Sequence, residues 1–223
     1  AMLAAITDKT KLIYIANPNN PTGTQFNRLQ WEAFISQVPK EVVVVLDEAY
    51  LEYAKSFDSE QGYPDGCDYL QDYPNLLVSR TFSKAYGLAS LRVGYVLGCD
   101  EIIQYINQLR APFNVNQLAQ VAACSALSDQ AFVAESVLLN QQGMRQLIEG
   151  LEALSVSYIP SVGNFICIDL GDAALEMNQK LLVEGVIVRP LANYGMPSFL
   201  RVSIGKQVEN QHFMDALKTV LSR

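Results

Sequence analysis

The sequence predicts an α/β protein with a three-layer, mainly parallel sheet, followed by a smaller α+β domain. Half of the 223 residues are hydrophobic, which suffices for a sizeable core. Short apolar runs alternate with helical patterns as far as residue 97, as crossover connections between parallel strands require. A long helical segment at 130–154 precedes shorter strands and helices. We therefore expect a large domain at 1–128 and a small domain at 129–223, joined through that helix.

In the large domain, strands are expected where β-prone apolar residues run together and stop at polar or turn residues. These strands are residues 12–16, 42–46, 76–78 and 93–97. The second run is continuously apolar, which is typical of a parallel strand buried on both faces. Asn27 is the expected N-cap of a helix at 27–37. An irregular stretch rich in Gly, Asp, Pro and Tyr is expected at 57–74.

The rest of the chain is mostly helical in pattern. Helices are expected at 101–110, 116–127, 130–154, 173–183 and 208–221. Strands of the small domain are expected at 156–159, 165–170, 186–188 and 200–204.

Composition excludes several classes of function. The net charge of -7 argues against nucleic acid as a partner, because phosphates are repelled by an acidic surface. No apolar run approaches bilayer-spanning length and no signal peptide opens the chain, so we expect a cytoplasmic protein without membrane association. His212 is the single histidine, which argues against Ser-His-Asp chemistry and multi-histidine metal sites. No metal site is expected.

Three polar clusters follow predicted strands: residues 17–23, 47–50 and 79–84. Ligands of such sheets bind at the carboxyl ends of the strands. Lys84 is the notable residue among them, because a lysine whose pKa is lowered by burial or by neighbouring cations forms Schiff bases with carbonyl compounds. Arg80 and Arg92 are expected to act in that direction. Taken singly, the residues also have ordinary interpretations: Asp47 as a helix N-cap, Asn20 as a turn residue, Tyr50 as a core aromatic, and Arg92 and Arg201 as surface ion-pair partners.

Four motifs in order resemble a known family. They are Asn17–Gly23 (NPNNPTG), Asp47–Tyr50 (DEAY), Ser79–Gly94 (SRTFSKAYGLASLRVG) and Leu200–Gly205 (LRVSIG). The chain resembles the fold type I aminotransferases, which depend on pyridoxal phosphate (PLP). Gly185–Pro190 (GVIVRP) and Tyr194–Pro197 (YGMP) make the resemblance closest to histidinol-phosphate aminotransferases.

The resemblance implies a PLP-transferase-like large domain and a role for each motif. Lys84 matches the lysine that forms the Schiff base and later moves the substrate proton. Asp47 matches the carboxylate that pairs with the pyridine nitrogen, and Asn20 and Tyr50 match the groups at the ring's 3-hydroxyl oxygen. Residues matching the phosphate site are Thr81, Ser83 and Arg92.

For the substrate, the resemblance implies that Arg201 binds a carboxylate and that Arg189 anchors the phosphate of histidinol phosphate. The implied reaction belongs to histidine biosynthesis and moves an amino group between histidinol phosphate and 2-oxoglutarate, in a homodimer. Glu48, Tyr86 and Tyr194 are expected to be packing or supporting residues.

The chain departs from the family at its start. Members carry an N-terminal part that includes a phosphate-binding helix N-terminus, and this sequence opens beyond it. We therefore expect a fragment that is feeble or inactive alone. Alternative functions are a related PLP enzyme, such as an aromatic aminotransferase or a threonine-phosphate decarboxylase, an aminotransferase-like ligand-sensing domain of a transcription regulator, or a fold remnant without cofactor.

Overall fold

The computed structural model describes residues 1–57 and 62–222. Residues 58–61 of the expected irregular stretch lie outside the described residues. The chain divides into two compact units: unit 1 is Ala1–Pro18 with Gln25–Ala134, and unit 2 is Asn19–Thr24 with Glu135–Arg223. The short segment Asn19–Thr24 therefore belongs with the C-terminal half of the chain. The domain border expected between residues 128 and 129 stays a prediction.

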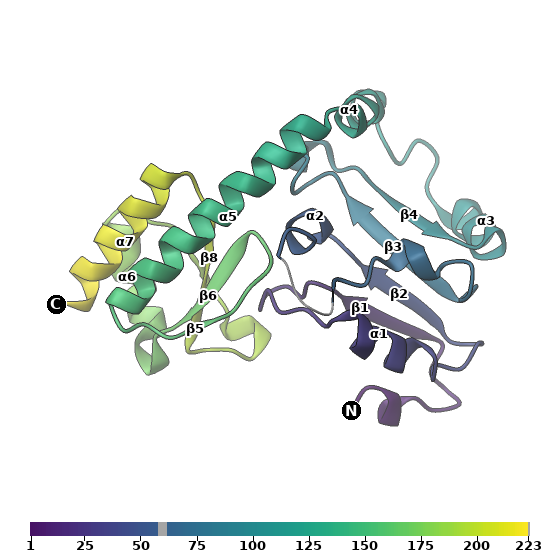
Figure 1. Ribbon diagram of the computed structural model, residues 1–223, viewed down its shortest axis with the longest axis horizontal. Coiled ribbons are helices and arrows are strands. Elements are labelled where there is room, and N and C mark those ends of the chain that lie inside the picture. The colour runs from purple at the N-terminus through teal and green to yellow at the C-terminus, as the bar shows by residue number, and fades with distance from the viewer. Residues whose placement is uncertain (58–61, 223) are drawn as a thin grey trace. The chain divides into compact units, whose positions relative to one another are not determined.

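Unit 1 is built on a four-stranded sheet in the order β1-β2-β3-β4 (Figure 1). Its strands are β1 (Leu12–Ala16), β2 (Val43–Asp47), β3 (Leu76–Thr81) and β4 (Gly94–Gly98). The first three strands are parallel, and β4 runs antiparallel to β3. The predicted α/β class with a mainly parallel sheet is confirmed.

One face of this sheet carries the core of unit 1. Alternate residues of the strands, such as Val44 and Leu46 of β2, pack with Trp31 and Ile35 of helix α1 (Arg28–Ile35). Asn27 begins α1 as expected, since its side chain accepts from the Gln30 amide and the Gln30 side chain accepts from the Asn27 amide. This face is the covered face of the sheet.

On the opposite face, the open face, many strand side chains remain accessible. Leu12, Tyr14 and Val96 are exposed, and Val43 and Val45 are only partly buried. The expectation that residues 42–46 are buried on both faces is therefore wrong. Its apolar run does form a strand, but within the described residues only one face of it meets a core.

The remaining elements of unit 1 are short or peripheral. They are η1 (Leu3–Ala5), α2 (Leu51–Ala54), η2 (Gly66–Tyr69), η3 (Ala89–Leu91), α3 (Asp100–Leu109) and α4 (Gln117–Ser128). Ala119 and Ala123 of α4 form a second cluster with Phe82 and Val93. This packing anchors the two ends of the segment between β3 and β4, which contains Lys84.

Unit 2 contains a four-stranded antiparallel sheet in the order β5-β6-β8-β7. Its strands are β5 (Tyr158–Ile159), β6 (Phe165–Asp169), β7 (Arg189–Pro190) and β8 (Phe199–Ser203). The helices are α5 (Gln130–Ala153), which begins in unit 1, η4 (Gly171–Ala173), α6 (Ala174–Val183), η5 (Ala192–Tyr194) and α7 (Gln207–Leu221).

The strand expected at 186–188 lies instead at 189–190. After α6 the chain turns at Gly185, whose φ is +78°. It reaches β8 only at Arg189, which pairs with Arg201. Ile187 remains 86% exposed, so its apolar character did not indicate a paired position.

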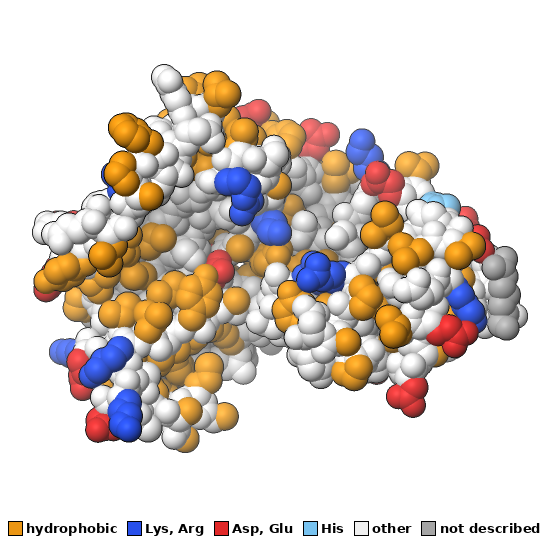
Figure 2. All heavy atoms as spheres, turned by 180° about the vertical axis from the view of Figure 1, so that it is seen from behind, with side chains coloured by type: hydrophobic (Ala, Val, Ile, Leu, Met, Phe, Trp, Pro, Cys, Tyr) orange, Lys and Arg blue, Asp and Glu red, His pale blue; other side chains and the backbone are white. Residues whose placement is uncertain are grey.

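Hydrophobic side chains reach the surface of both units, as Figure 2 shows for one view. Among the described residues, no single helix is long and apolar enough to cross a membrane, although the bent pair Gln117–Ser128 and Gln130–Ala153 meets that test by length and composition.

Candidate functional site

The three polar clusters at residues 17–23, 47–50 and 79–84 lie at the carboxyl ends of β1, β2 and β3. Asn17 follows β1 directly, and Asp47 and Thr81 are the last residues of β2 and β3. The register pairs Ala16 with Asp47, and Asp47 with Ser79. Because directly paired residues point to the same face of a sheet, Asp47 and Ser79 share the open face. The predicted location at the strand ends is confirmed for these residues.

The Asp47 carboxylate is held through both of its oxygen atoms. The Tyr14 hydroxyl donates to Oδ2 at 2.8 Å, and the Ala49 amide donates to Oδ1 at 3.1 Å. Asp47 is not a helix N-cap, because α2 begins after Tyr50. A carboxylate fixed in this way at a strand end is suited to pair with a cationic group of a ligand.

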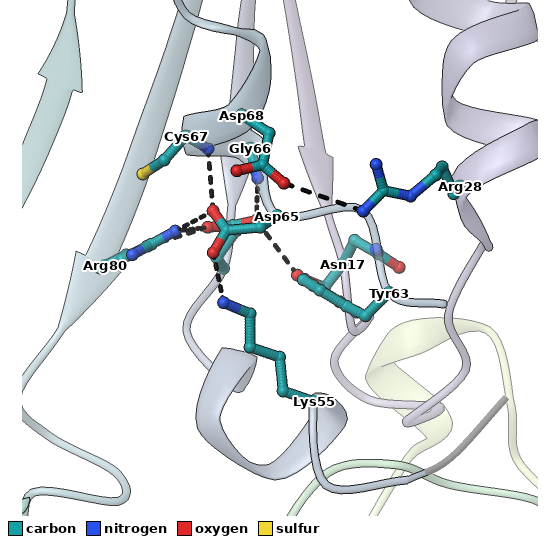
Figure 3. Close-up of polar contacts among 10 residues, drawn as sticks. Asn17, Arg28, Lys55, Tyr63, Asp65, Gly66, Cys67, Asp68 and Arg80 are labelled. Atoms are coloured by element: carbon teal, nitrogen blue, oxygen red, sulfur yellow. Dashed lines mark hydrogen bonds and ion pairs between the residues drawn. The ribbon is translucent and has the colours of Figure 1, made fainter. Parts of the chain in front are cut away.

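The next residue, Glu48, turns toward the covered side and meets a polar cluster. Its Oε2 accepts from Nε and Nη2 of Arg80 at 2.9 and 2.7 Å, and its Oε1 accepts from the Gly66 amide at 2.7 Å. Arg80 Nη2 also donates to Asp65 Oδ1 at 2.5 Å. Figure 3 shows Arg80 of β3 and Lys55 pointing at Asp65 from different directions.

Burial is the largest influence on the Glu48 carboxyl and raises its pKa, although Arg80 acts in the opposite direction. The charge of Arg80 is thus shared by two carboxylates. Its expected contribution to cationic crowding around Lys84 is wrong, because alternation along β3 sends Arg80 to the covered face, with its partner Tyr95.

Lys84 lies in the turn after β3 and is partly buried. Its Nζ stands 5.1 Å from the ring centroid of Tyr50, over the ring face. The contact brings together two predicted site residues that lie 34 positions apart in the sequence, and a cation over an aromatic ring is a favourable arrangement. The Gly87 amide donates to the Lys84 carbonyl and closes the turn, with Gly87 at φ +71°.

The three residues expected to bind phosphate are connected to one another. The Ser83 amide donates to Thr81 Oγ1 at 3.1 Å, and Arg92 Nη1 donates to Ser83 Oγ at 3.3 Å. Arg92 also donates to the Ala89 carbonyl at 2.8 Å. Its φ of 54° is unusual for a residue other than glycine. Such strain is concentrated at functional sites, where the surrounding structure maintains it.

Unit 2 holds the other three candidates. Arg201 Nη1 donates to Asn20 Oδ1, and the Arg201 guanidinium lies 5.0 Å from the Phe165 ring centroid. Arg189 pairs directly with Arg201 in the β7–β8 ladder, so both side chains leave the same face of the sheet. Arg189 is exposed and makes no ion pair with a described residue. Two cations on one face are suited to an anionic ligand with more than one oxygen.

Tyr14 is the residue that sequence analysis missed. The period of β1 predicts that residues 12, 14 and 16 share a face, but only the register with β2 shows that Tyr14 reaches Asp47. Glu48 was expected to have a supporting role, and its contacts with Arg80 and Gly66 fit one. Within the described residues, no group of three His, Cys, Asp or Glu side chains could hold a metal ion.

Solved structures share this fold. The histidinol-phosphate aminotransferase from Clostridium acetobutylicum matches with a TM-score of 0.87 at 26% identity, over 96% of this chain and 65% of that chain. The enzyme of that name from Sinorhizobium meliloti, in complex with pyridoxal-5'-phosphate, matches with a TM-score of 0.85 at 31% identity, over 95% of this chain and 57% of that chain. The fold is therefore that of the PLP-transferase-like α/β proteins.

The sequence identifies the family within this fold. The family described as "Aminotransferase class I and II" matches residues 1–217. The chain belongs to this family. Histidinol-phosphate aminotransferase 2 of Hydrogenovibrio crunogenus is 61% identical over 223 residues, which are 100% of this chain and 59% of that protein. The chain thus spans about three-fifths of the length of this curated relative.

Proposed function

We propose that this chain is part of a PLP-dependent transaminase that moves an amino group between histidinol phosphate and 2-oxoglutarate, in histidine biosynthesis. The observation that carries the proposal is the set of groups in unit 1: a partly buried amine over Tyr50, a fixed carboxylate, and hydroxyls linked to a guanidinium. The 61% identity to a protein named for that activity supports the choice of substrate.

The donor set fits PLP group by group. Lys84 Nζ would attach the cofactor through its aldehyde carbon, and Tyr50 would contact the 3-hydroxyl oxygen of the ring. Asp47 would accept from the protonated ring nitrogen, because a nearby anion favours the charged form. Thr81 and Ser83 would donate to the phosphate, with the Arg92 guanidinium as its counter-charge.

Bound PLP supplies an electron sink for the carbon that carries the amino group. The protein's own contribution is the movement of a proton and the control of charge. Lys84 Nζ, once displaced by the substrate amine, would take the proton from that carbon and deliver it to the former aldehyde carbon of PLP. Asp47 would keep the ring nitrogen protonated during this transfer, so the carbon remains acidic.

Unit 2 would bind the substrate. Arg201, with its guanidinium oriented by Asn20, would hold the carboxylate of 2-oxoglutarate or glutamate. Arg189, on the same face, would bind the phosphate of histidinol phosphate. Arginine suits both tasks, because its planar fork matches carboxylate and phosphate oxygens in pairs.

We also infer a homodimer in the cytoplasm. The family resemblance supports the homodimer. All four cysteines are free thiols, which fits a reducing compartment.

A PLP titration of the 223-residue chain tests the cofactor. We expect a visible absorbance band that appears with PLP and is lost in Lys84→Ala. Lys40→Ala is the matched control, since Lys40 is exposed and outside the site. A band that survives in Lys84→Ala would contradict the assignment of Lys84, whereas no band in wild type would show that this chain does not bind PLP by itself.

Substrate screening separates the rival functions. Conversion of the PLP band by histidinol phosphate, but not by histidinol, and its return with 2-oxoglutarate would support the proposed reaction. A preference for an aromatic amino acid, or release of carbon dioxide from threonine phosphate, would identify another PLP enzyme. Binding of ligand without conversion would favour a sensing domain.

A further inference from the structure

Tyr14 lies outside the four motifs on which the family resemblance rests, yet its side chain contacts Asp47 of the second motif. It is the middle residue of β1 and pairs with Val45, two positions before Asp47. The pairing places Tyr14, Val45 and Asp47 on the open face of the sheet. From there the Tyr14 hydroxyl spans the gap between strands and donates to Asp47 Oδ2 at 2.8 Å.

Packing does not explain this position of the Tyr14 side chain. The residue is 61% exposed and is absent from the core cluster that contains its neighbours Ile13 and Ile15. An exposed tyrosine is free to point its hydroxyl at water. The Tyr14 hydroxyl is directed instead at Asp47, to which it donates a hydrogen bond.

With this contact, both carboxylate oxygens of Asp47 accept a hydrogen bond. The Ala49 amide fixes Oδ1, but it leaves the carboxylate able to turn about the bond between Cβ and Cγ. A second donor on Oδ2, brought by another strand, removes this freedom. Hydrogen bonds to an ionised acceptor are short and strong, so the orientation is well defined.

The charge state of Tyr14 suits this task. Desolvation is the first cause that raises the pKa of Tyr14, and the hydrogen bond and negative charge of Asp47 raise it further, while a hydrogen bond with Ser79 of β3 acts in the opposite sense. The phenol therefore keeps its proton at neutral pH. It donates to the carboxylate without adding a charge beside it.

We propose that Tyr14 is a positioning residue, whose hydroxyl holds the Asp47 carboxylate in the orientation that meets the ring nitrogen of PLP. The proposal rests on the proposed function of Asp47. It extends the site to a strand that none of the four motifs contains.

The first test needs no cofactor. With ¹³C label at Cζ of the tyrosines, the Tyr14 resonance, assigned by its loss in Tyr14→Phe, is followed against pH in the wild-type chain and in Asp47→Asn. We expect Tyr14 to titrate above its ordinary pKa and to move back toward it in Asp47→Asn. Tyr105, exposed on α3, is the control, and its resonance should be the same in Asp47→Asn as in wild type. An unshifted Tyr14, or a shift of the same size in Asp47→Asn as in wild type, would overturn the proposal.

The second test uses PLP itself. Tyr14→Phe should bind PLP roughly ten-fold more weakly than wild type, because one charge-assisted hydrogen bond no longer orients Asp47. Its visible band should also change with pH over a different range, which a purely structural loss would not produce. Tyr105→Phe should match wild type in both respects.

Equal affinity and an unchanged pH profile in Tyr14→Phe would refute the positioning role. If wild type itself gives no Lys84-dependent band, PLP binding by this chain has failed instead. In that case the tyrosine titration alone decides whether Tyr14 holds Asp47.

Discussion

Glu48 and Asp47 are consecutive residues that point to opposite sides of the unit 1 sheet. Asp47 ends β2 on the open face, whereas Glu48 is buried against Arg80 and the Gly66 amide. Because the peptide that joins them is rigid, anchoring one side chain restricts the direction of the other. The buried pair of Glu48 and Arg80 therefore supports the candidate site from behind.

Replacing Glu48 by Ala should lower the free energy of unfolding by about 3 kcal/mol, because the variant leaves Arg80 with one carboxylate fewer and the buried Gly66 amide without its acceptor. Urea denaturation measures the change. Glu41→Ala is the control, since Glu41 is exposed at the start of the same strand region. A loss no larger than that of the control would show that the pair does not stabilise unit 1.

The lowered pKa of Asp65 predicts how the free energy of unfolding changes at acidic pH. Burial acts to raise its pKa, but the hydrogen bonds from Lys55 and the Cys67 amide, with the charge of Arg80, outweigh it and lower the pKa from 3.8 to about 2. A depressed folded pKa gives stability that is present above 3.8 and is lost as the pH falls toward about 2. Asp65→Asn should flatten that part of a plot of unfolding free energy against pH. An unchanged slope between the two values would contradict the assignment.

A substitution of Arg189 tests whether Arg189 and Arg201 bind different groups, phosphate and carboxylate. Arg189→Gln should weaken the binding of histidinol phosphate roughly ten-fold, since one charge-assisted contact to phosphate is lost, and should leave histidinol binding unchanged. Isothermal titration calorimetry measures both ligands. Arg145→Gln, on the exposed side of α5, is the control. Equal losses for both ligands would assign Arg189 to something other than the phosphate.

At the scale of elements, the end of α5 carries strain that has no part in the candidate site. Ser155 follows the helix with φ 56°, and the Val156 amide donates to the Leu151 carbonyl in the pattern of a helix C-terminus that favours glycine. Ser155→Gly should raise the free energy of unfolding by about 1 kcal/mol. The control Ser157→Gly, outside the left-handed region, should not stabilise the chain. A destabilised Ser155→Gly would contradict this explanation.

The sequence predicts strands and helices better than it predicts what covers them. Runs such as 42–46 and 165–170 were recognised because apolar, β-branched residues indicate strands whatever lies against them. The open face of β2 was missed, because burial depends on neighbours that local pattern does not contain. The same limit applies at the candidate site, because a local motif does not contain the register between strands. The motifs predict Asp47, but its partner Tyr14 follows only from the pairing of β1 with β2.

At the scale of the whole molecule, each unit has buried hydrophobic residues of its own among the described residues. Leu46 and Leu181 are both fully buried, the first in the unit 1 sheet core and the second on α6 in unit 2. Each unit also holds its own candidate residues, with Lys84 and Asp47 in one and Arg189 and Arg201 in the other. Loss of packing in one core is therefore expected to affect one set before the other.

Hydrogen exchange measured under native conditions can separate these two cores. Leu181→Ala should cost about 3 kcal/mol, and the loss should appear as faster exchange of amides in β6 and β8, while amides in β1 and β2 keep their protection. Leu46→Ala is the corresponding variant of unit 1, and it should speed the exchange of amides in β1 and β2 first. If either variant lowers protection equally in both sheets, the units unfold as one cooperative body, and a substitution that weakens substrate binding in unit 2 would then be expected to loosen the Lys84 region as well.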